Sequence, residues 1–290
     1  MKKKLALISI LLLIVIPVAV VWSIGTSLTD SVNTLIGEPP KDIPLNAVQF
    51  SSKSGAKIHG WFANGVDGKG VIILMHGVQA NRLVMLDRAR FLNKNGYSVL
   101  LFDFQAHGES IGEHITFGYL ESRDAQAAVE FVRSKLPQEK IGVIGVSMGG
   151  AAFLLAQPKL DVDAAVLEMV YPAIEQATSN RLKLYLGNWA GIFTPLLTWQ
   201  LKPRLGIGVN DLRPIDCAGL ITIPKLFIAG EKDEHTTLEE SETLFKAASK
   251  PKELWIIPNA KHTDAYALTK AEYEQRVLSF FEKNLQNNAN

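Results

Sequence analysis

The chain is poor in cysteine and has no excess of either charge. Its single cysteine among 290 residues, Cys217, excludes an internal disulfide and a metal site built from several cysteines. No histidine is near Cys217 in the sequence, so the thiol is not a candidate nucleophile. The 30 basic and 29 acidic residues give a net charge of +1 and form no basic stripe, so nucleic acid is not an expected partner. Hydrophobic residues make up 47% of the chain, which is enough for a substantial core.

One long hydrophobic run is set apart at the amino terminus. It extends over residues 5–22 without a charged residue and follows Lys2, Lys3 and Lys4. As a helix it would cover about 27 Å, close to the ~30 Å hydrocarbon core of a bilayer. The lysines are expected to stay in the cytoplasm, with the following domain on the far side of the membrane. We therefore expect residues 1–25 to be an uncleaved signal anchor; the alternative is a cleaved signal peptide and a secreted protein.

Beyond this run, the pattern predicts one α/β domain. Residues 26–44 read as a spacer, because three prolines exclude a long helix. From residue 45 to 290, apolar strand-like runs alternate with segments of helical spacing, which predicts a mostly parallel sheet with helices on both faces. The alternation breaks at about residues 171–210, where leucine, tryptophan, glycine and proline predict a small cap of short helices.

Three chemically useful residues follow predicted strands. Ser147 ends the strand of "IGVIGVSMGG", Asp233 follows "KLFIAG", and His262 follows "ELWIIP". Because ligands gather at the carboxyl ends of parallel strands, these side chains are expected to lie together. A serine hydroxyl needs a base to become a nucleophile, a neutral imidazole is such a base, and a carboxylate fixes the imidazole tautomer. The sequence thus predicts nucleophilic acyl transfer.

These segments resemble the α/β-hydrolase superfamily. The similarity covers roughly residues 48–285 and includes "VIILMHGVQANR", "YSVLLFDFQAHGES", "GVSMG" and "IPKLFIAGEKDEHT". The resemblance implies Ser147 as nucleophile, His262 as base and Asp233 as acid, with the backbone N–H groups of Val78 and Met148 as oxyanion donors. It implies a serine hydrolase that cleaves carboxylic esters, small or lipid-like, through an acyl-enzyme, with neither a metal nor an organic cofactor. The chain departs from the family at Gln105-Ala106, where Arg-Gly is usual.

Several alternatives stay open at this stage. Glu168 ends another predicted strand, where some relatives carry the acid. His76 is interpreted as supporting the oxyanion loop, and His235 as a residue of a first helical turn rather than a metal ligand. The cap aromatics Trp189, Phe193 and Trp199, with Leu197, are consistent with contact to a membrane. The same triad would also serve a thioesterase, a peptidase or an acyltransferase, and fold alone does not exclude an inactive binding protein.

Overall fold

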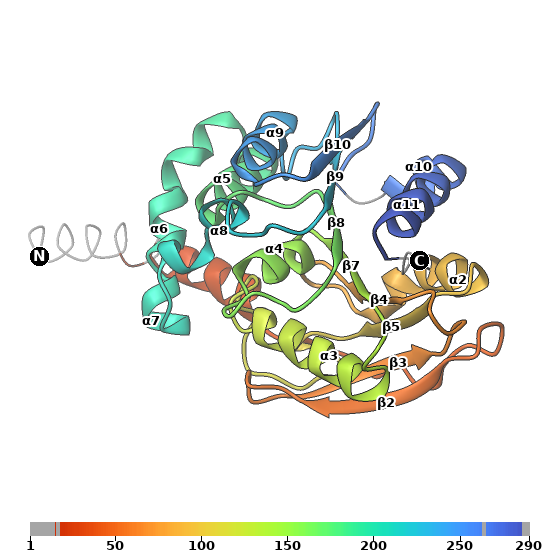
Figure 1. Cartoon of the computed structure of the whole chain (residues 1–290). Coiled ribbons are helices and arrows are strands. Elements are labelled where there is room, and N and C mark those ends of the chain that lie inside the picture. Colours follow the sequence, from red (N-terminus) through yellow and green to blue (C-terminus); the bar gives the residue numbers. More distant parts are fainter. Residues whose placement is uncertain (1–14, 16–17, 263–264, 286–290) are drawn as a thin grey trace, which may run out of the picture.

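A twisted sheet forms the centre of the described structure. The computed structural model describes residues 15, 18–262 and 265–285. Within them, eight strands form one sheet in the order β10-β9-β8-β7-β4-β5-β3-β2 (Figure 1). The strands from β10 to β5 pair in parallel, whereas β3 pairs antiparallel with β5 and with β2. Their bounds are β2 Asn46–Ser51, β3 Lys57–Ala63, β4 Val71–Met75, β5 Ser98–Phe102, β7 Ile141–Val146, β8 Ala164–Glu168, β9 Lys225–Gly230 and β10 Lys252–Ile257.

The continuous apolar runs become strands that are buried on both faces. In β4 the side chains of Val71, Ile73 and Met75 join one core cluster, whereas Ile72 and Leu74 join the other. This alternation follows from the two-residue period of a strand, and it explains why the run shows no polar face.

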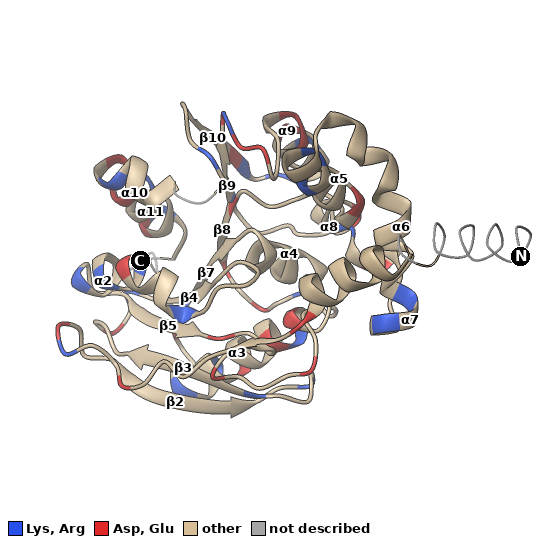
Figure 2. Cartoon of the chain, turned by 180° about the vertical axis from the view of Figure 1, so that it is seen from behind, with Lys and Arg blue, Asp and Glu red and all other residues tan. Residues whose placement is uncertain are grey.

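Helices cover both faces of the sheet (Figure 1). One core cluster contains residues of α3 (Glu121–Lys135), α4 (Met148–Leu155), α8 (Pro214–Ala218) and α9 (Leu238–Ala247). The other contains residues of α2 (Leu86–Lys94), α10 (Ala265–Leu268) and α11 (Lys270–Leu285). The predicted fold class, a mostly parallel sheet between helical layers, is confirmed. Blue and red residues are both spread over the outer helices in Figure 2.

A group of short helices, here called the cap, lies between β8 and β9 (Figure 1). It contains α5 (Ile174–Leu186), α6 (Thr194–Thr198) and α7 (Leu201–Leu205), with the 3-10 turns η2 (Asn188–Phe193) and η3 (Val209–Leu212). Trp189 and Trp199 are largely exposed, at 63% and 69%. Phe193 and Leu197 are half-buried.

The segment before the sheet packs against the domain. Residues 18–29 form a helix, here called the N-terminal helix, beside α6 and α7 (Figure 1). The predicted spacer, residues 26–44, contributes β1 (Val32–Asn33), which pairs in parallel with β6 (His107–Gly108). Most of the predicted membrane run, residues 5–14, 16 and 17, lies outside the described residues. Among the residues that are described, no helix is both long and apolar enough to cross a membrane.

Candidate active site

Ser147 occupies a sharp turn between β7 and α4. Its backbone is in a strained region, with φ 50° and ψ −111°, a conformation that costs about 1–3 kcal/mol and must be held by its surroundings. Its N–H donates to the carbonyl of Glu168 at 2.8 Å, which fixes the turn to the end of β8. Ser147 is 8% exposed, so only a small part of the side chain is accessible.

The flanking glycines are required by close packing. A Cβ on Gly149 would lie 2.4 Å from the carbonyl oxygen of Met75, and a Cβ on Gly145 would lie 2.7 Å from the backbone of Gly150. Neither glycine has a positive φ. The strained dihedral angles therefore belong to Ser147 itself, and the glycines let α4 approach the strands closely enough to hold it.

The three predicted residues meet at the carboxyl edge of the sheet. The Nε2 atom of His262 is 3.1 Å from the Oγ atom of Ser147, and Nδ1 is 2.8 Å from Oδ2 of Asp233. The second carboxylate oxygen of Asp233, Oδ1, accepts from the N–H groups of His235 and Thr236 at 2.8 and 2.9 Å. With the carboxylate on Nδ1, the imidazole carries its proton there and leaves Nε2 to accept from the serine hydroxyl.

The two residues that carry the predicted oxyanion donors line the same cavity as Ser147. The N–H of Met148 begins α4, and the N–H of Val78 follows β4; both residues line a cavity with Ser147. A Cβ built on Gly77 would lie 3.6 Å from the Cβ of Ser147, so this loop passes beside the serine. Neither amide hydrogen bonds to any residue in the described ranges. Both are therefore available to an oxyanion.

Two buried neutral histidines hold the loop that carries Val78. His76 donates from Nδ1 to the carbonyl of Gly77 at 2.7 Å, while its Nε2 accepts from the N–H of Phe104 at 3.1 Å. His107 accepts at Nε2 from the N–H of Gln79 at 3.1 Å. Burial, and then the neighbouring His107, lower the pKa of His76 to about 3. Burial likewise lowers the pKa of His107. The sequence predicted the supporting role of His76, whereas the matching bond of His107 depends on the path of a loop that the sequence does not specify.

The departure at Gln105-Ala106 is accommodated by other contacts. Gln105 donates from Nε2 to Glu121 at 2.9 Å and to the carbonyl of His114 at 2.7 Å. The buried guanidinium of Arg82 pairs with two carboxylates of the same region, those of Asp103 and Glu109.

Glu168, the alternative acid, does not contact His262. Its carboxylate accepts from Arg88 Nη2 at 2.7 Å and from the hydroxyl of Tyr273, and all three residues are buried. Because both oxygens are bound by Arg88 and Tyr273, and His262 bonds to Asp233 instead, the geometry gives no support to Glu168 as the acid.

His235 lies beside His262, with ring centroids 5.0 Å apart. Burial lowers its pKa, as does the nearby His262. In the described part of the chain, no group of three His, Cys, Asp or Glu side chains is arranged to hold a metal ion.

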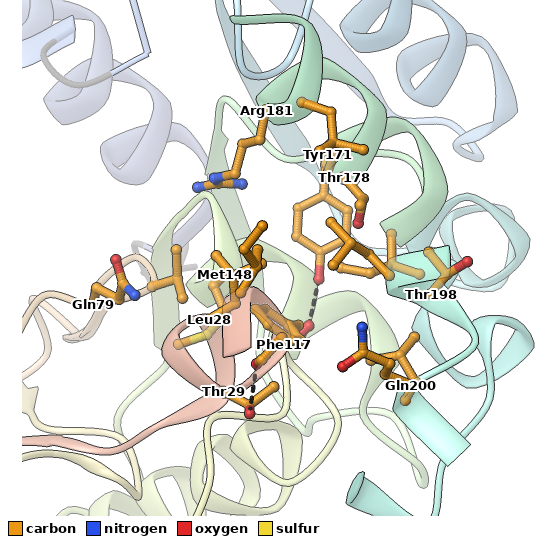
Figure 3. Close-up of a pocket in the computed structure, with 18 of the residues that line it drawn as sticks. Leu28, Thr29, Gln79, Phe117, Met148, Tyr171, Thr178, Arg181, Thr198 and Gln200 are labelled. Carbon is orange, nitrogen blue, oxygen red and sulfur yellow. Dashed lines mark hydrogen bonds between the residues drawn. The ribbon is translucent and has the colours of Figure 1, made fainter. Parts of the chain in front are cut away.

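A largely apolar cavity of about 310 Å³ opens beside Ser147 between the cap and the N-terminal helix (Figure 3). The helix α5 presents one face to it. Besides the residues already named, its lining includes Ile24, Leu28, Phe117, Tyr171, Ile174, Leu182, Tyr185, Leu197, Leu201 and Arg204. The hydroxyl of Tyr171 donates to the carbonyl of Phe117, which connects the segment before α5 to the loop before α3 (Figure 3).

The N-terminal helix forms one wall of this cavity and is held there by α7 and the residue before it. Gln200, which is 3% exposed, donates to the carbonyl of Val21 at 3.0 Å. The guanidinium of Arg204 donates to the carbonyl of Trp22 and lies 4.0 Å from the centre of its ring. No pattern in the sequence predicts this contact, because the two segments are about 180 residues apart.

Comparison with known proteins places the chain in a family. Residues 67–211 match the family model described as "Serine aminopeptidase, S33", and residues 198–290 match one described as "PhoPQ-activated pathogenicity-related protein". The first match covers half of the chain, which therefore belongs to this family of α/β hydrolases.

Its relatives include curated proteins and solved structures. The chain is 27% identical over 242 residues to the uncharacterised protein YqkD of Bacillus subtilis, covering 81% of this chain and 79% of that protein. It is 25% identical to the uncharacterised protein YfhR of Escherichia coli K12, covering 83% and 82%. The structure of the Pyrococcus furiosus esterase Pf2001 superposes with a TM-score of 0.72 at 26% identity, covering 88% of this chain and 100% of that one.

Proposed function

We propose that this protein is a serine hydrolase that cleaves carboxylic esters through an acyl-enzyme. The observation that carries the proposal is the hydrogen-bonded series Ser147–His262–Asp233, with distances of 3.1 and 2.8 Å, beside a largely apolar cavity. Such a series is the arrangement that activates a serine for attack on a carbonyl carbon.

Each residue has a defined part in the reaction. His262 takes the hydroxyl proton at Nε2 as Ser147 Oγ bonds to the ester carbonyl carbon. Asp233, buried and held by two backbone N–H groups, stabilises the imidazolium through Nδ1–H. The N–H groups of Met148 and Val78 stabilise the tetrahedral oxyanion. The imidazolium then protonates the leaving alkoxide as the tetrahedral intermediate collapses to the acyl-enzyme. A water molecule, deprotonated by His262, attacks the acyl carbon, and His262 returns this proton to Ser147 Oγ as the C–Oγ bond breaks and the acid is released.

The cavity favours an ester over a peptide with a free amino terminus. The family description names an aminopeptidase, and an aminopeptidase must bind the ammonium group of its substrate. Among the described residues that line the cavity, none is an aspartate or a glutamate, while Arg181 and Arg204 are present. A cationic substrate would meet positive charge there, whereas an apolar acyl chain meets matching side chains. Thioesters and acyl transfer remain compatible with the same machinery.

Labelling with a fluorophosphonate tests the proposal. The wild-type chain should react with the probe and hydrolyse short p-nitrophenyl esters, and Ser147→Ala should lose both properties. Ser134→Ala is the matched control, because that serine is exposed on α3 and bonds only to the carbonyl of Phe131. A wild-type chain that is neither labelled nor active on any ester would instead support an inactive binding protein of this fold.

We also propose that the run of residues 5–22 anchors the protein in a membrane, with the hydrolase domain outside the cytoplasm. The exposed Trp189 and Trp199 support this arrangement, because they belong to the cap, against which the N-terminal helix packs. Indole rings favour the interface between membrane and water. The full chain should remain with membranes after alkaline extraction, whereas recovery in the soluble fraction would contradict the proposal.

A further inference from the structure

One charged side chain in the cavity, that of Arg181, forms no ion pair with any of the described residues. Arg181 and Arg204 both line the cavity, but they differ in their contacts. Arg204 is engaged with Gln200, Trp22 and the backbone of the N-terminal helix. The guanidinium of Arg181 makes no hydrogen bond and no ion pair with any residue of the described ranges. Its position beside the nucleophile is therefore unexplained by the packing of the fold.

The carboxylate that interacts electrostatically with Arg181 already has other hydrogen-bond partners. Asp233 is close enough to stabilise the charge of Arg181 electrostatically. However, Oδ1 of this carboxylate accepts from two backbone N–H groups and Oδ2 faces His262. Burial lowers the pKa of Arg181 below the usual arginine value, yet a guanidinium stays charged at neutral pH. The cavity thus contains a half-buried cation whose N–H donors bond to no residue in the part of the chain that the structure describes.

The helix that carries Arg181 is fixed in place. The neighbouring Asn180 is buried and donates from Nδ2 to the Glu240 carboxylate at 2.8 Å and to the carbonyl of His235 at 3.2 Å. These bonds join α5 to the start of α9. One turn earlier on α5, Thr178 also lines the cavity, because residues three apart share a helix face. In Figure 3, the guanidinium of Arg181 extends from α5 toward the side of the cavity that carries Met148 and Gln79.

We propose that Arg181 binds an anionic group of the substrate, so that the preferred substrate is an ester with an apolar chain and a carboxylate or phosphate. This inference rests on the proposed ester hydrolysis and specifies its substrate class. A guanidinium binds carboxylate and phosphate through paired N–H donors, and the bond is strong where water is partly excluded. The hydroxyl of Thr178 and the side-chain amide of Gln79 are further donors in the same lining. The apolar residues of α5 and the N-terminal helix would surround the chain that joins the anionic group to the ester.

Matched p-nitrophenyl esters test the inference. The series comprises the adipate monoester, which has a terminal carboxylate, the adipamate ester, which has a neutral terminal amide, and the 5-phosphonopentanoate ester. In the wild-type chain, an anionic ester should exceed the neutral one in kcat/KM by about 10- to 100-fold, the usual worth of a hydrogen bond to a charged group. The carboxylate and phosphonate esters show which anion is preferred.

Substitution of Arg181 assigns the preference. Arg181→Gln should remove the discrimination between anionic and neutral esters, and Arg181→Lys should retain part of it. Lys183→Gln is the control, because Lys183 is exposed on the same helix outside this cavity and the same formal charge is lost. Equal rates for the anionic and neutral esters in the wild-type chain, or a preference that survives in Arg181→Gln, would overturn the inference.

Failure of the inference can be separated from failure of the proposed function. If the wild-type chain turns over no ester at all, ester hydrolysis is refuted, but binding of hexylphosphonate can still be measured. Weaker binding to Arg181→Gln than to Lys183→Gln would support the anion site, whereas equal binding would exclude it.

Discussion

Acidification should weaken the fold through His76. Its side chain is fully buried between the Gly77 carbonyl and the Phe104 N–H, and its pKa is lowered from 6.5 to about 3. Below pH 6.5 the imidazole of His76 therefore takes up a proton in the unfolded chain, whereas in the folded chain it stays neutral until the pH approaches 3. Stability attributable to His76 is complete above pH 6.5 and is lost progressively as the pH falls toward 3.

The magnitude follows from the width of this window. Each pH unit inside it corresponds to about 1.4 kcal/mol, so the loss between pH 8 and pH 5 is about 2 kcal/mol. Asp124 acts in the opposite direction. Burial raises its pKa to about 7, so the folded chain takes up a proton there below pH 7, before the unfolded chain does. The total pH dependence is therefore a sum, and His76 must be isolated by comparison with a variant.

His76→Asn provides that comparison, because asparagine keeps a donor near Gly77 and does not titrate. Urea unfolding of both proteins, followed by the fluorescence of the five tryptophans, should be measured from pH 8 to pH 5. The variant should be less stable at pH 8, but its deficit should shrink by about 2 kcal/mol at pH 5. If His107 is more easily protonated in the variant, the variant loses less stability at low pH, and its deficit relative to the wild-type chain shrinks further. A deficit that stays constant with pH would refute the reasoning.

Three further predictions concern other parts of the structure. Glu168→Gln should destabilise the fold by about 3–5 kcal/mol, because it leaves Arg88 buried without its carboxylate partner. Asp233→Asn should instead lower kcat by a factor on the order of 10⁴, because the imidazole of His262 loses the carboxylate that fixes its tautomer. Urea unfolding and ester kinetics on both variants test these two predictions. A loss of activity without a loss of stability in Glu168→Gln would indicate that Glu168, and not Asp233, is the catalytic acid. Gly149→Ala should lose activity and stability, because the added Cβ would lie 2.4 Å from the carbonyl oxygen of Met75. Gly208→Ala is the control and should retain both, because its Cβ would lie 3.8 Å from the nearest atom, Oδ2 of Asp211. Gln200→Ala removes a neutral hydrogen bond to the N-terminal helix, which contributes about 1 kcal/mol. The KM for an octanoyl ester should therefore rise about fivefold, while the KM for an acetyl ester changes less. Equal changes in KM for the two esters would contradict a role of this helix in holding the acyl chain.

The sheet and the positions of the three candidate catalytic residues could be predicted from the sequence because they depend on local patterns. A strand buried on both faces is a short apolar run whatever its neighbours, and Ser147, Asp233 and His262 each follow such a run. Parallel pairing then brings the ends of β7, β9 and β10 to one edge. The structure brings the three side chains together as expected, and their catalytic roles remain predictions until activity is measured.

The walls of the cavity could not be predicted, because they depend on contacts between distant segments. The bond from Gln200 to Val21 joins residues that share no pattern in the sequence. Arg181 looks like an ordinary charged residue of a helix, and only the packing of α5 over the site turns it toward the cavity. Likewise, the sequence does not show that Glu168 pairs with Arg88 while Asp233 pairs with His262, because this depends on where the fold positions Arg88 and His262.

The position of the N-terminal helix has a consequence for processing of the chain. Ile24, Gly25, Leu28 and Thr29 all line the cavity. Proteolysis after Gly25 would remove part of this wall and create a positively charged amino group at Thr26, beside the apolar lining. A released form would then differ in specificity from the intact chain, and not only in location.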